Sequence, residues 1–584
     1  MSLLSRRFRS DFHPAWLSLL AVAIIPLILG YDFINGLPLG RTVLGAVMLM
    51  FTLGLFFLGL PVSGSVGRQF SKEFRQQMPG ALVGLLGVMV IGWLGRGYEP
   101  WGLFFGGLSI IMIGAGAFGY EWDARTMTVL LTQPRGRFYL YLTKMLPMGC
   151  LLLLVTYSGL VSLAENNDHW VMSDAERRSI LLIVFLPGLL AFSSGPFFAL
   201  LARGTLAGGL FGVVVPGLIV GCGNAALGWL YRLQNGVEPM GTPPYFVEFL
   251  FIAGFLYILA TAILSWRLFS RLQVREGGPG SESIHGIMRP LDWLLRIIPA
   301  RPGGVTSALV RKELRLHLLP WLLAIVYLVL AALLWVGANR VEEVRDNFKD
   351  LQVVAACGFG VLIVMTTGAA VIAEERQLGT LDWQLTSPVS VYRQWWTKFG
   401  VGLVLALVLG VALPQMVLQT VLGSRLADFN ETFDGTARCI ATGLAIGLFA
   451  LATFASSLTR STARAATAAA AIGLATGALT ITLPSWVLNE FSQMLRQGDG
   501  VFVPHSVFGV MDAATLESVT LVWAVVAPML LAVAWTLLAA NNYRAGAPTG
   551  RRCYWQTGVV SCLPLALGVL TAGLIIMRLE VGLR

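Results

Sequence analysis

Charged residues are scarce in this chain, and their scarcity indicates its class. Asp, Glu, Lys and Arg together make up 12% of the 584 residues, whereas hydrophobic residues make up 56%. Apolar runs near or above about 20 residues, the length that crosses a bilayer as a helix, recur throughout the sequence. These runs are continuous and lack the period-two alternation of a transmembrane barrel. We therefore predict an all-α fold, a polytopic transmembrane helical bundle.

The chain also lacks the motifs of nucleotide, metal and hydrolytic chemistry. No Gly-Lys dipeptide occurs, so the chain has no P-loop to hold nucleotide phosphates. The five histidines are dispersed, the six cysteines have no CxxC spacing, and no HExxH or Gly-x-Ser-x-Gly pattern stands out. We expect no catalytic residue, no metal site and no cofactor on this chain.

Ionisable side chains are almost absent from the interiors of the predicted spans. A proton-coupled or sodium-coupled transporter needs such groups near the bilayer midplane. An ion-coupled secondary transporter is therefore a less favoured alternative. A second alternative is a membrane scaffold or complex-assembly protein that moves no substrate. Basic cytoplasmic loops explain the net charge of +10, so we expect no nucleic-acid partner.

Fifteen spans are predicted from the apolar runs, and the loops between them give their direction. Lys and Arg gather in alternate loops, which puts the N-terminus in the cytoplasm. We expect an integral protein of the bacterial inner membrane. The predicted spans lie near residues 15–34, 41–62, 79–97, 101–119, 145–164, 179–201, 205–230, 247–269, 320–338, 352–373, 399–423, 437–457, 465–488, 518–540 and 556–577.

One polar segment occurs twice between apolar runs. The first copy, residues 121–144, reads EWDARTMTVLLTQPRGRFYLYLTK, and the second copy, residues 375–398, reads ERQLGTLDWQLTSPVSVYRQWWTK. Aligned without gaps at an offset of 254, the copies share a Glu, three Thr, a Leu, a Pro and a Lys. Both copies lie in loops predicted to face the cytoplasm. The chain therefore repeats one polar device on one side of the membrane.

A Lys-Glu-x-Arg element precedes each copy and enters the first span of its half. It reads Lys72-Glu73-Phe74-Arg75 in one half and Lys312-Glu313-Leu314-Arg315 in the other. These landmarks predict two parallel six-span units in one chain. The predicted boundaries are an extra N-terminal pair of helices at 1–66, a first unit at 67–275, a cytoplasmic linker with a candidate interfacial helix at 276–305, a second unit at 306–545 and an extra C-terminal span at 546–584.

This combination of elements resembles the membrane subunits of type-2 ABC exporters. The second copy carries the pattern best, as Glu374-Glu375-Arg376-Gln377-Leu378-Gly379-Thr380-Leu381, whereas the first has Arg125 in place of Gly379. The resemblance implies two permease units fused in tandem. The loop after each second span would form a coupling helix that fits a groove on a cytoplasmic ABC ATPase. Two copies of that ATPase would hold the ATP and Mg, and transport would run outward.

The residues selected for this role fall into two groups. The candidates on the ATPase-coupling loops are Glu121, Thr126, Leu131, Pro134, Lys144, Glu375, Gly379, Thr380, Leu385, Pro388 and Lys398. The candidates on the approach segments, which lead into the first span of each unit, are Lys72, Glu73, Arg75, Lys312, Glu313 and Arg315. Membrane lipids and an extracytoplasmic partner at the loop 484–518 are also expected to bind. The substrate stays open.

The repeated residues have expected physical roles. The glutamate stands where a span ends, and it is placed to accept free backbone N–H groups at the start of a short helix. The proline limits that helix, which is expected to end near Leu131 or Leu385. The lysine begins the next span at the level of the lipid headgroups, and its ammonium group is expected to extend outward to water.

Overall fold

A computed structural model of the chain describes all or most of ten segments and some isolated positions. The segments are residues 99–123, 126–133, 135–165, 188–201, 246–272, 305–340, 345–422, 435–459, 461–470 and 513–544, and the isolated positions fall within 72–85 and 203–235 and at 472, 473 and 556. All regular secondary structure within these residues is helical. The predicted extra helices at 1–66 and most of the linker 276–305 lie outside them.

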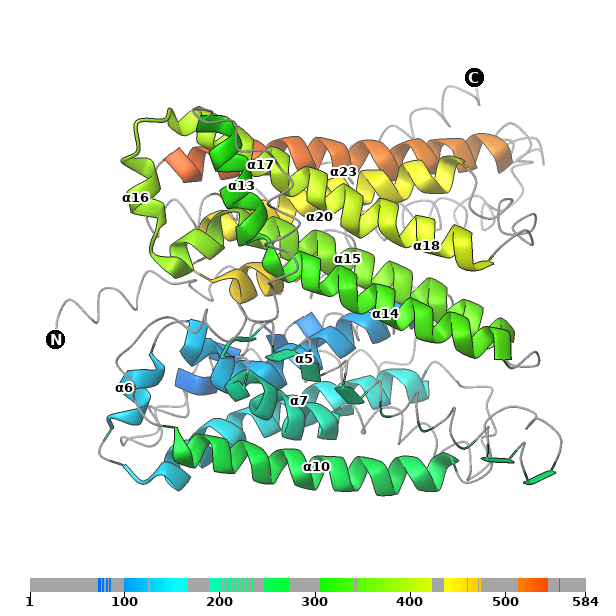
Figure 1. The fold of residues 1–584 in the computed structure, drawn as a ribbon. Coiled ribbons are helices and arrows are strands. Elements are labelled where there is room, and N and C mark those ends of the chain that lie inside the picture. The colour runs from blue at the N-terminus through cyan, green and yellow to red at the C-terminus, as the bar shows by residue number, and fades with distance from the viewer. Residues whose placement is uncertain are drawn as a thin grey trace, which may run out of the picture.

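The described helices form one elongated bundle (Figure 1). They are α5 (Glu99–Asp123), α6 (Met127–Leu131), α7 (Arg137–Glu165), α10 (Phe246–Arg271), α13 (Val305–Leu316), α14 (Leu318–Arg340), α15 (Arg345–Leu378), α16 (Leu381–Leu385), α17 (Val391–Leu407), the π-helix η1 (Val408–Ala412), α18 (Leu413–Leu422), α20 (Gly435–Leu458) and α23 (Ala513–Arg544).

Five described helical stretches are long and apolar enough to cross a membrane. They are Glu248–Arg271, Leu318–Val336, Ala355–Leu378, Val391–Thr420 and Arg438–Leu458. Each coincides with a span predicted from the sequence. The helices α5, α7 and α23 cover three further predicted spans. The other seven predicted spans lie wholly or partly outside the described residues, so the total of fifteen stays a prediction.

Several helices begin earlier than their apolar runs, and α17 shows one physical cause. The span predicted at 399–423 starts at Val391, because the hydroxyl of Ser390 caps the helix by accepting from the backbone N–H of Arg393 at 3.4 Å. The same helix changes to a π-helix over Val408–Ala412. Pro414 follows, and since proline has no backbone N–H, the regular α-helical hydrogen bond to residue 410 is missing there.

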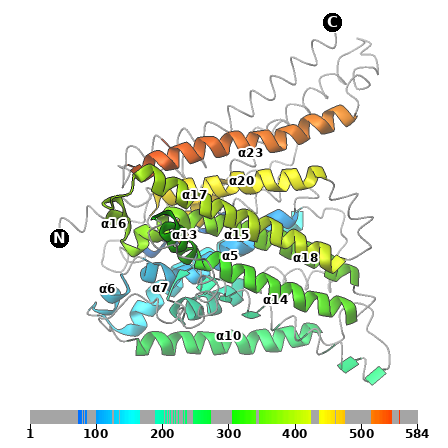
Figure 2. The same cartoon turned by 45° about the horizontal axis from the view of Figure 1, so that its top comes forward.

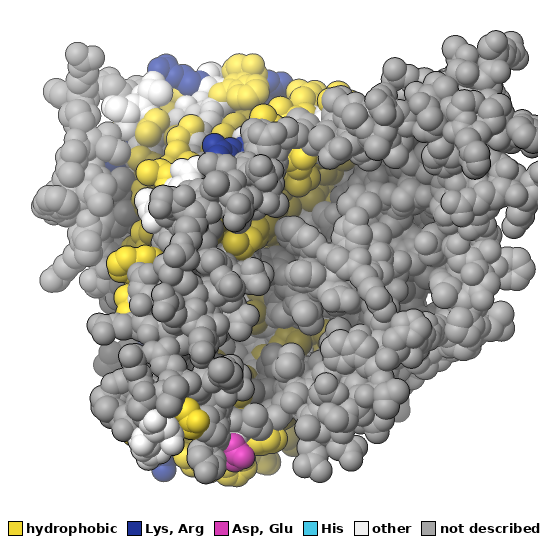
Figure 3. Space-filling view, turned by 90° about the vertical axis from the view of Figure 1, so that its right-hand side faces the viewer, with side chains coloured by type: hydrophobic (Ala, Val, Ile, Leu, Met, Phe, Trp, Pro, Cys, Tyr) yellow, Lys and Arg dark blue, Asp and Glu magenta, His cyan; other side chains and the backbone are white. Residues whose placement is uncertain are grey.

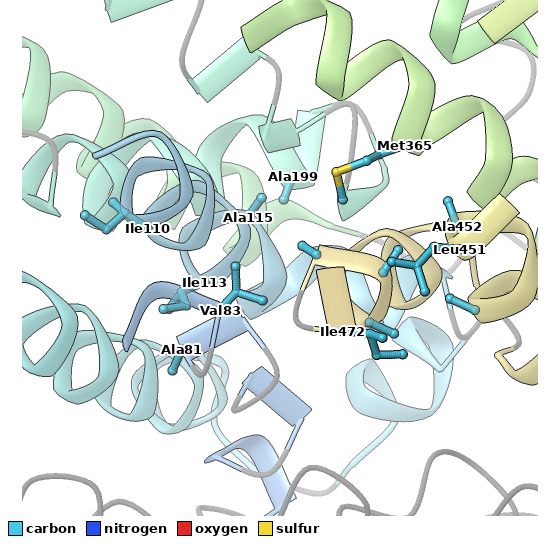
Figure 4. Close-up of a cluster of buried hydrophobic side chains, with 14 of the residues drawn as sticks. Ala81, Val83, Ile110, Ile113, Ala115, Ala199, Met365, Leu451, Ala452 and Ile472 are labelled. Carbon is cyan, nitrogen blue, oxygen red and sulfur yellow. The ribbon is translucent and has the colours of Figure 1, made fainter. Parts of the chain in front are cut away.

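The two halves of the chain pack together through buried apolar side chains. One cluster of buried residues includes Ile113 and Ala115 of α5, Met365 of α15 and Leu451 of α20. Figure 4 shows these side chains gathered between the helices of the two halves. On the end of the bundle seen in Figure 3, hydrophobic groups predominate among the described side chains. The bundle is therefore apolar both where its halves meet and on parts of its surface.

Glycine allows a close helix contact in each half at the same place in the repeat. A Cβ atom on Gly114 of α5 would lie 2.5 Å from the carbonyl oxygen of Ala191, and a Cβ on Gly368 of α15 would lie 2.6 Å from that of Phe449. The two glycines are 254 positions apart, the offset of the polar segments. The correspondence between the halves thus extends into the helices that lead to the loops.

Replacing Gly368 with Ala is expected to push α15 away from α20, because the new methyl group meets backbone that cannot rotate aside. We expect the free energy of unfolding to fall by roughly 1–3 kcal/mol. Gly400→Ala in α17 is the matched control, since nothing lies within 4 Å of its Cβ position. Thermal unfolding in detergent measures both variants. A Gly368→Ala protein as stable as the Gly400→Ala protein would contradict this packing.

Candidate functional site

The two polar segments fold into the same local structure. Each contains a five-residue helix, Met127–Leu131 in α6 and Leu381–Leu385 in α16, at positions that differ by the offset of the repeat. The following long helices start at Arg137 and Val391, again at equivalent positions. Figures 1 and 2 both show α6 and α16 at the same end of the bundle. We call α6 and α16 the loop helices.

Each loop helix is set off from the preceding span by the same hydrogen bond. The backbone N–H of Thr126 donates to the carbonyl of Glu121 at 2.8 Å, and that of Thr380 donates to the carbonyl of Glu375 at 2.9 Å. In the second copy, Gly379 has a φ of +71° and its N–H donates to Arg376 at 3.2 Å. This is the Schellman ending of a helix, and it explains why glycine stands at this position.

The loop helices also end where the sequence predicts. The N–H groups of Thr132 and Thr386, which directly follow them, donate to the carbonyls of Thr128 at 3.1 Å and Asp382 at 3.2 Å. The predicted ends at Leu131 and Leu385 are confirmed. Pro388 lies exposed in the turn after α16. Its counterpart Pro134 lies outside the described residues.

The first loop rests on a group of four charged residues, three of them buried, which we call the first quartet. Lys144 of α7 is 0% exposed, and its ammonium group lies 2.7 Å from Glu73 Oε2 and 2.8 Å from Glu121 Oε1. Lys72 approaches Glu121 Oε1 at 3.2 Å from the surface. The Thr126 hydroxyl donates to the second oxygen of Glu121. Two lysines therefore balance two glutamates brought from three separate segments.

The second loop rests on a second quartet with the same composition. Lys398 of α17 is 1% exposed and lies 2.8 Å from Glu313 Oε1 and 2.6 Å from Glu375 Oε1. Lys312 of α13 lies 2.5 Å from Glu375 Oε1 and donates to Gln384 Oε1 of α16 at 2.7 Å. The approach helix α13, the span α15, the loop helix and the next span are thereby joined at one point.

The quartets correct two expectations from the sequence. Lys144 and Lys398 were expected to extend outward to water, but both ammonium groups point into the protein. Each binds two buried carboxylates, and these ion pairs compensate the cost of removing the ammonium group from water. A lysine that extends outward would not have to meet that cost. Glu121 and Glu375 were expected to cap backbone N–H groups. Their carboxylates instead accept from lysines, and no side-chain cap bond is made at the start of either loop helix.

The first quartet keeps its glutamate ionised. Burial alone would raise the pKa of Glu121, but the charges of Lys144 and Lys72, with hydrogen bonds from Lys144 and Thr126, lower it from 4.5 to about 2. Burial would likewise lower the pKa of Lys144, but Glu73 and Glu121 raise it above its usual value. At neutral pH Glu121 and Lys144 are therefore both charged.

In the second quartet, burial and a neighbouring carboxylate disfavour the ionised form of one glutamate. Burial raises the pKa of Glu313, and the neighbouring Glu375 carboxylate adds to this, while Lys398 opposes it. Burial also lowers the pKa of His317, which follows α13, to about 3, with the nearby Lys398 charge acting in the same direction. His317 is therefore uncharged at neutral pH and adds no further cation beside Lys398.

The outer faces of the two loop helices differ. Val129 is 61% exposed on α6, and the equivalent Trp383 is 85% exposed on α16. Thr128 and Asp382, which precede them, are also exposed. The first loop therefore presents a neutral aliphatic tip, whereas the second presents an aromatic side chain beside a carboxylate. An exposed tryptophan of this kind is typical of a binding surface.

Two residues that fasten the second loop were not predicted from the sequence. The amide nitrogen of Gln394 donates to the carbonyls of Gln384 at 3.2 Å and Val389 at 2.8 Å and to the hydroxyl of Ser387 at 2.9 Å. The hydroxyl of Tyr543 at the end of α23 donates to Gln394 Oε1 at 3.1 Å. The signal in the sequence was a polar residue, Gln394, at the position where the first copy has Leu140. The structure shows both side chains buried.

In each half, the turn after the fourth predicted span, at Arg203 in the first half and at Thr459 in the second, contacts the end of the second span. In the first half, the guanidinium of Arg203 stacks on the ring of Trp122 at 5.5 Å. In the second half, Arg376, which replaces Trp122 in the repeat, donates to the carbonyls of Ser457 at 2.5 Å and Thr459 at 3.2 Å. Each half thus has one arginine joining these two elements, supplied from opposite sides of the contact.

The remaining predicted residues can also be placed. Leu131 is buried and Leu385 partly buried against the core, while Arg315 is exposed on α13. Arg75 lies outside the described residues, as does the predicted loop 484–518 up to residue 512, whereas its last six residues begin α23. No group of three or more potential metal ligands occurs within the described part of the chain.

Residues 338–541 match the family model of the ABC-2 family transporter protein. The match runs from the end of α14 nearly to the end of α23 and includes Glu375, Lys398 and the second loop helix. No curated protein and no solved structure matches the chain. The match and the apolar helices support an integral membrane protein with a permease domain of an ABC transporter.

Replacing Lys398 with Met is expected to destabilise the protein strongly, because Glu313 and Glu375 would stay buried without their central cation. The expected loss is roughly 3–5 kcal/mol of unfolding free energy. Lys312→Met is the matched control, since its side chain is 39% exposed and water can replace it. Unfolding temperatures in detergent compare the two. Equal, small losses would show that the second quartet does not stabilise the fold.

The pH dependence of a Lys144→Met protein tests the first quartet. In the wild type, the pKa of Glu121 lies at about 2, below its ordinary 4.5, so its stabilisation is present above pH 4.5 and lost toward pH 2. Without Lys144, burial outweighs attraction and the folded-state pKa rises above 4.5. The variant is therefore expected to gain more in unfolding temperature than the wild type when the pH is lowered from 8 to 5, because only the variant adds the protonation of Glu121 to that of the other buried carboxyls. An equal gain in both proteins would contradict this role of Lys144.

Proposed function

We propose that this chain is the membrane permease of an ABC transporter and that each half supplies one coupling helix. The observation that carries this proposal is the pair of loop helices, which share one offset, one local fold and one end of the bundle. Their tips are exposed and their bases are fixed by the quartets. A pair of short helices held in this way is suited to receive force from a partner.

The family match supports the proposal for the second half, and the geometry of the repeat supports it for the first half. The matched region, residues 338–541, contains α16 and two residues of the second quartet. The first half lies outside the match. Its loop nevertheless has equivalent backbone hydrogen bonds and a quartet of the same residue types, two lysines and two glutamates. We infer that the two halves act as two permease units around a route between them.

The quartets give a physical path for the force. Motion of α16 is passed to α13 through Lys312 and Gln384, and to α15 and α17 through Glu375 and Lys398. The ion pairs of Lys398 with Glu313 and Glu375 are buried, so they resist separation more than surface pairs do. A push on the loop helix therefore moves three helices together rather than bending the loop.

The partner implied by this design is a cytoplasmic ATPase. The family normally works with a separate ATPase subunit, which here would supply the ATP and Mg and bind in two copies, one to each loop helix. We infer export as the direction and a cytoplasmic position for the loop helices. Membrane lipids would cover the exposed apolar side chains of α10, which include Phe251, Ile252 and Phe255.

The double variant Trp383→Ala with Val129→Ala tests this function. Both side chains are exposed apolar tips of the loop helices, so a bound partner would bury them. Removing a tryptophan that is buried in an interface is expected to weaken the complex by about tenfold or more. The chain is purified from its native membrane, a P-loop ATPase in the preparation is identified by peptide mass, and its amount and ATP hydrolysis are measured.

Trp335→Ala is the matched control, because Trp335 is also exposed but lies near the far end of α14. It is expected to retain the ATPase. Absence of any P-loop ATPase from the wild-type preparation would overturn the proposal. An ATPase that binds but hydrolyses ATP at the same rate with and without the permease would favour a scaffold instead.

A further inference from the structure

The two halves of the chain touch through residues at equivalent positions of the repeat. The amide of Gln377 on α15 donates to Asp123 Oδ1 on α5 at 3.3 Å, and these residues are 254 positions apart. Equivalent positions of two related units come together only near the axis that relates the units. This contact therefore marks the pseudo-twofold axis at the end of the bundle that carries the loop helices.

Further polar contacts surround this point. Glu374 Oε2 accepts from the hydroxyl of Thr462 at 2.7 Å, and Gln377 Oε1 accepts from the backbone N–H of Thr462 at 3.4 Å. The turn at Thr205 lies directly against α5, because a Cβ on Gly119 would be 2.5 Å from the Thr205 Cα. Each of these contacts lies within one half. The end of α15 contacts the turn at Thr462, and the end of α5 contacts the turn at Thr205. In each unit that turn follows the fourth predicted span.

We propose that the contact between Asp123 and Gln377 forms the gate that closes the route between the two halves on the side of the loop helices, and that Thr462 and Glu374 hold Gln377 in place within the second half. This inference rests on the proposed transport function and deepens it. The gate is closed in the structure described here. Force on α6 and α16 opens it by separating the ends of α5 and α15.

Helical geometry connects the gate to the quartets. Asp123 lies two residues after Glu121, and Gln377 lies two residues after Glu375. Two residues turn about 200° around an α-helix, so the quartet and the gate lie on opposite faces of the same helix end. A force that moves the quartet therefore moves the gate residue with it. The loop helix begins only a few residues further on.

Polar contacts suit a gate that must open repeatedly. The net free energy of such a hydrogen bond is small, because water replaces the lost partner on opening. Next to the gate, Met112 and Tyr120 of α5 pack on Ala463 and form a small apolar seal. A few polar contacts and a small apolar contact are within the range that an ATPase can break.

The charge at the gate allows it to be manipulated. Burial raises the pKa of Asp123 to about 6, against hydrogen bonds from Thr205 and Gln377 and the charge of Arg464. The other titratable groups that face it are Glu374 and the hydroxyl of Tyr120. At pH 7.5 Asp123 is therefore ionised. A second carboxylate at position 377 would repel it, whereas an amine would attract it.

The test joins the two gate positions covalently. Asp123→Cys with Gln377→Cys is introduced into a chain whose six native cysteines are replaced, together with a protease site in the linker 276–305, so that a cross-link keeps the cleaved halves together on a gel. The chain is purified with its ATPase. Oxidation is expected to cross-link the halves and to lower ATP hydrolysis by at least about fivefold, with recovery on reduction. Asp123→Cys alone is the control.

Charge variants provide a second measurement. Gln377→Glu is expected to open the gate by repulsion and raise ATP hydrolysis, Gln377→Lys to close it by attraction, and Asp123→Asn to restore the Gln377→Glu protein. A cross-linked complex that hydrolyses ATP at the unlinked rate would overturn the gate. Loss of ATPase from the wild-type preparation would overturn the transport function itself, while cross-linking in the chain alone would still report whether the two positions meet.

Discussion

A buried lysine held between two glutamates is the interaction on which each loop depends. Removing an ammonium group from water is costly, and the structure compensates this with two carboxylates at 2.6–2.8 Å. The partners of Lys144 lie 71 and 23 positions earlier in the chain, and those of Lys398 lie 85 and 23 positions earlier. Each lysine therefore fixes the approach segment, the second span and the third span relative to one another.

This constraint explains how five-residue helices can have a fixed position. An isolated helix of that length is unstable in water, because its few hydrogen bonds do not offset the ordering of its backbone. Both ends of α6 and α16 are held by longer helices that meet at the quartets. In the second loop, Gln394 and Tyr543 add a further attachment. The exposed side chains at the tips can then contact a partner, although the five residues would not form a stable helix on their own.

The sequence predicts the residues of the site better than it predicts their contacts. All eight quartet residues were selected from the repeat, and the ends of both loop helices were predicted correctly. The inward lysines were not, because the rule that lysine extends toward water is local, whereas the pairing joins segments far apart in the chain. Gln394 and the Asp123–Gln377 contact were not predicted. The candidates were chosen mainly where the two copies carry the same residue, and the copies differ at these positions. The spans were predicted from apolar runs, which do not reveal a cap such as Ser390.

The distribution of identities and differences between the copies follows from their positions. The shared glutamate and lysine serve the quartets, which need the same chemistry twice. The copies differ where they face outward, at Val129 and Trp383, and where they face each other, at Asp123 and Gln377. Two aspartates meeting at an axis would repel, whereas an aspartate and a glutamine supply an acceptor and a donor. Two copies within one chain are free to diverge in this way, while two identical subunits related by symmetry would have to place the same residue on both sides of the contact.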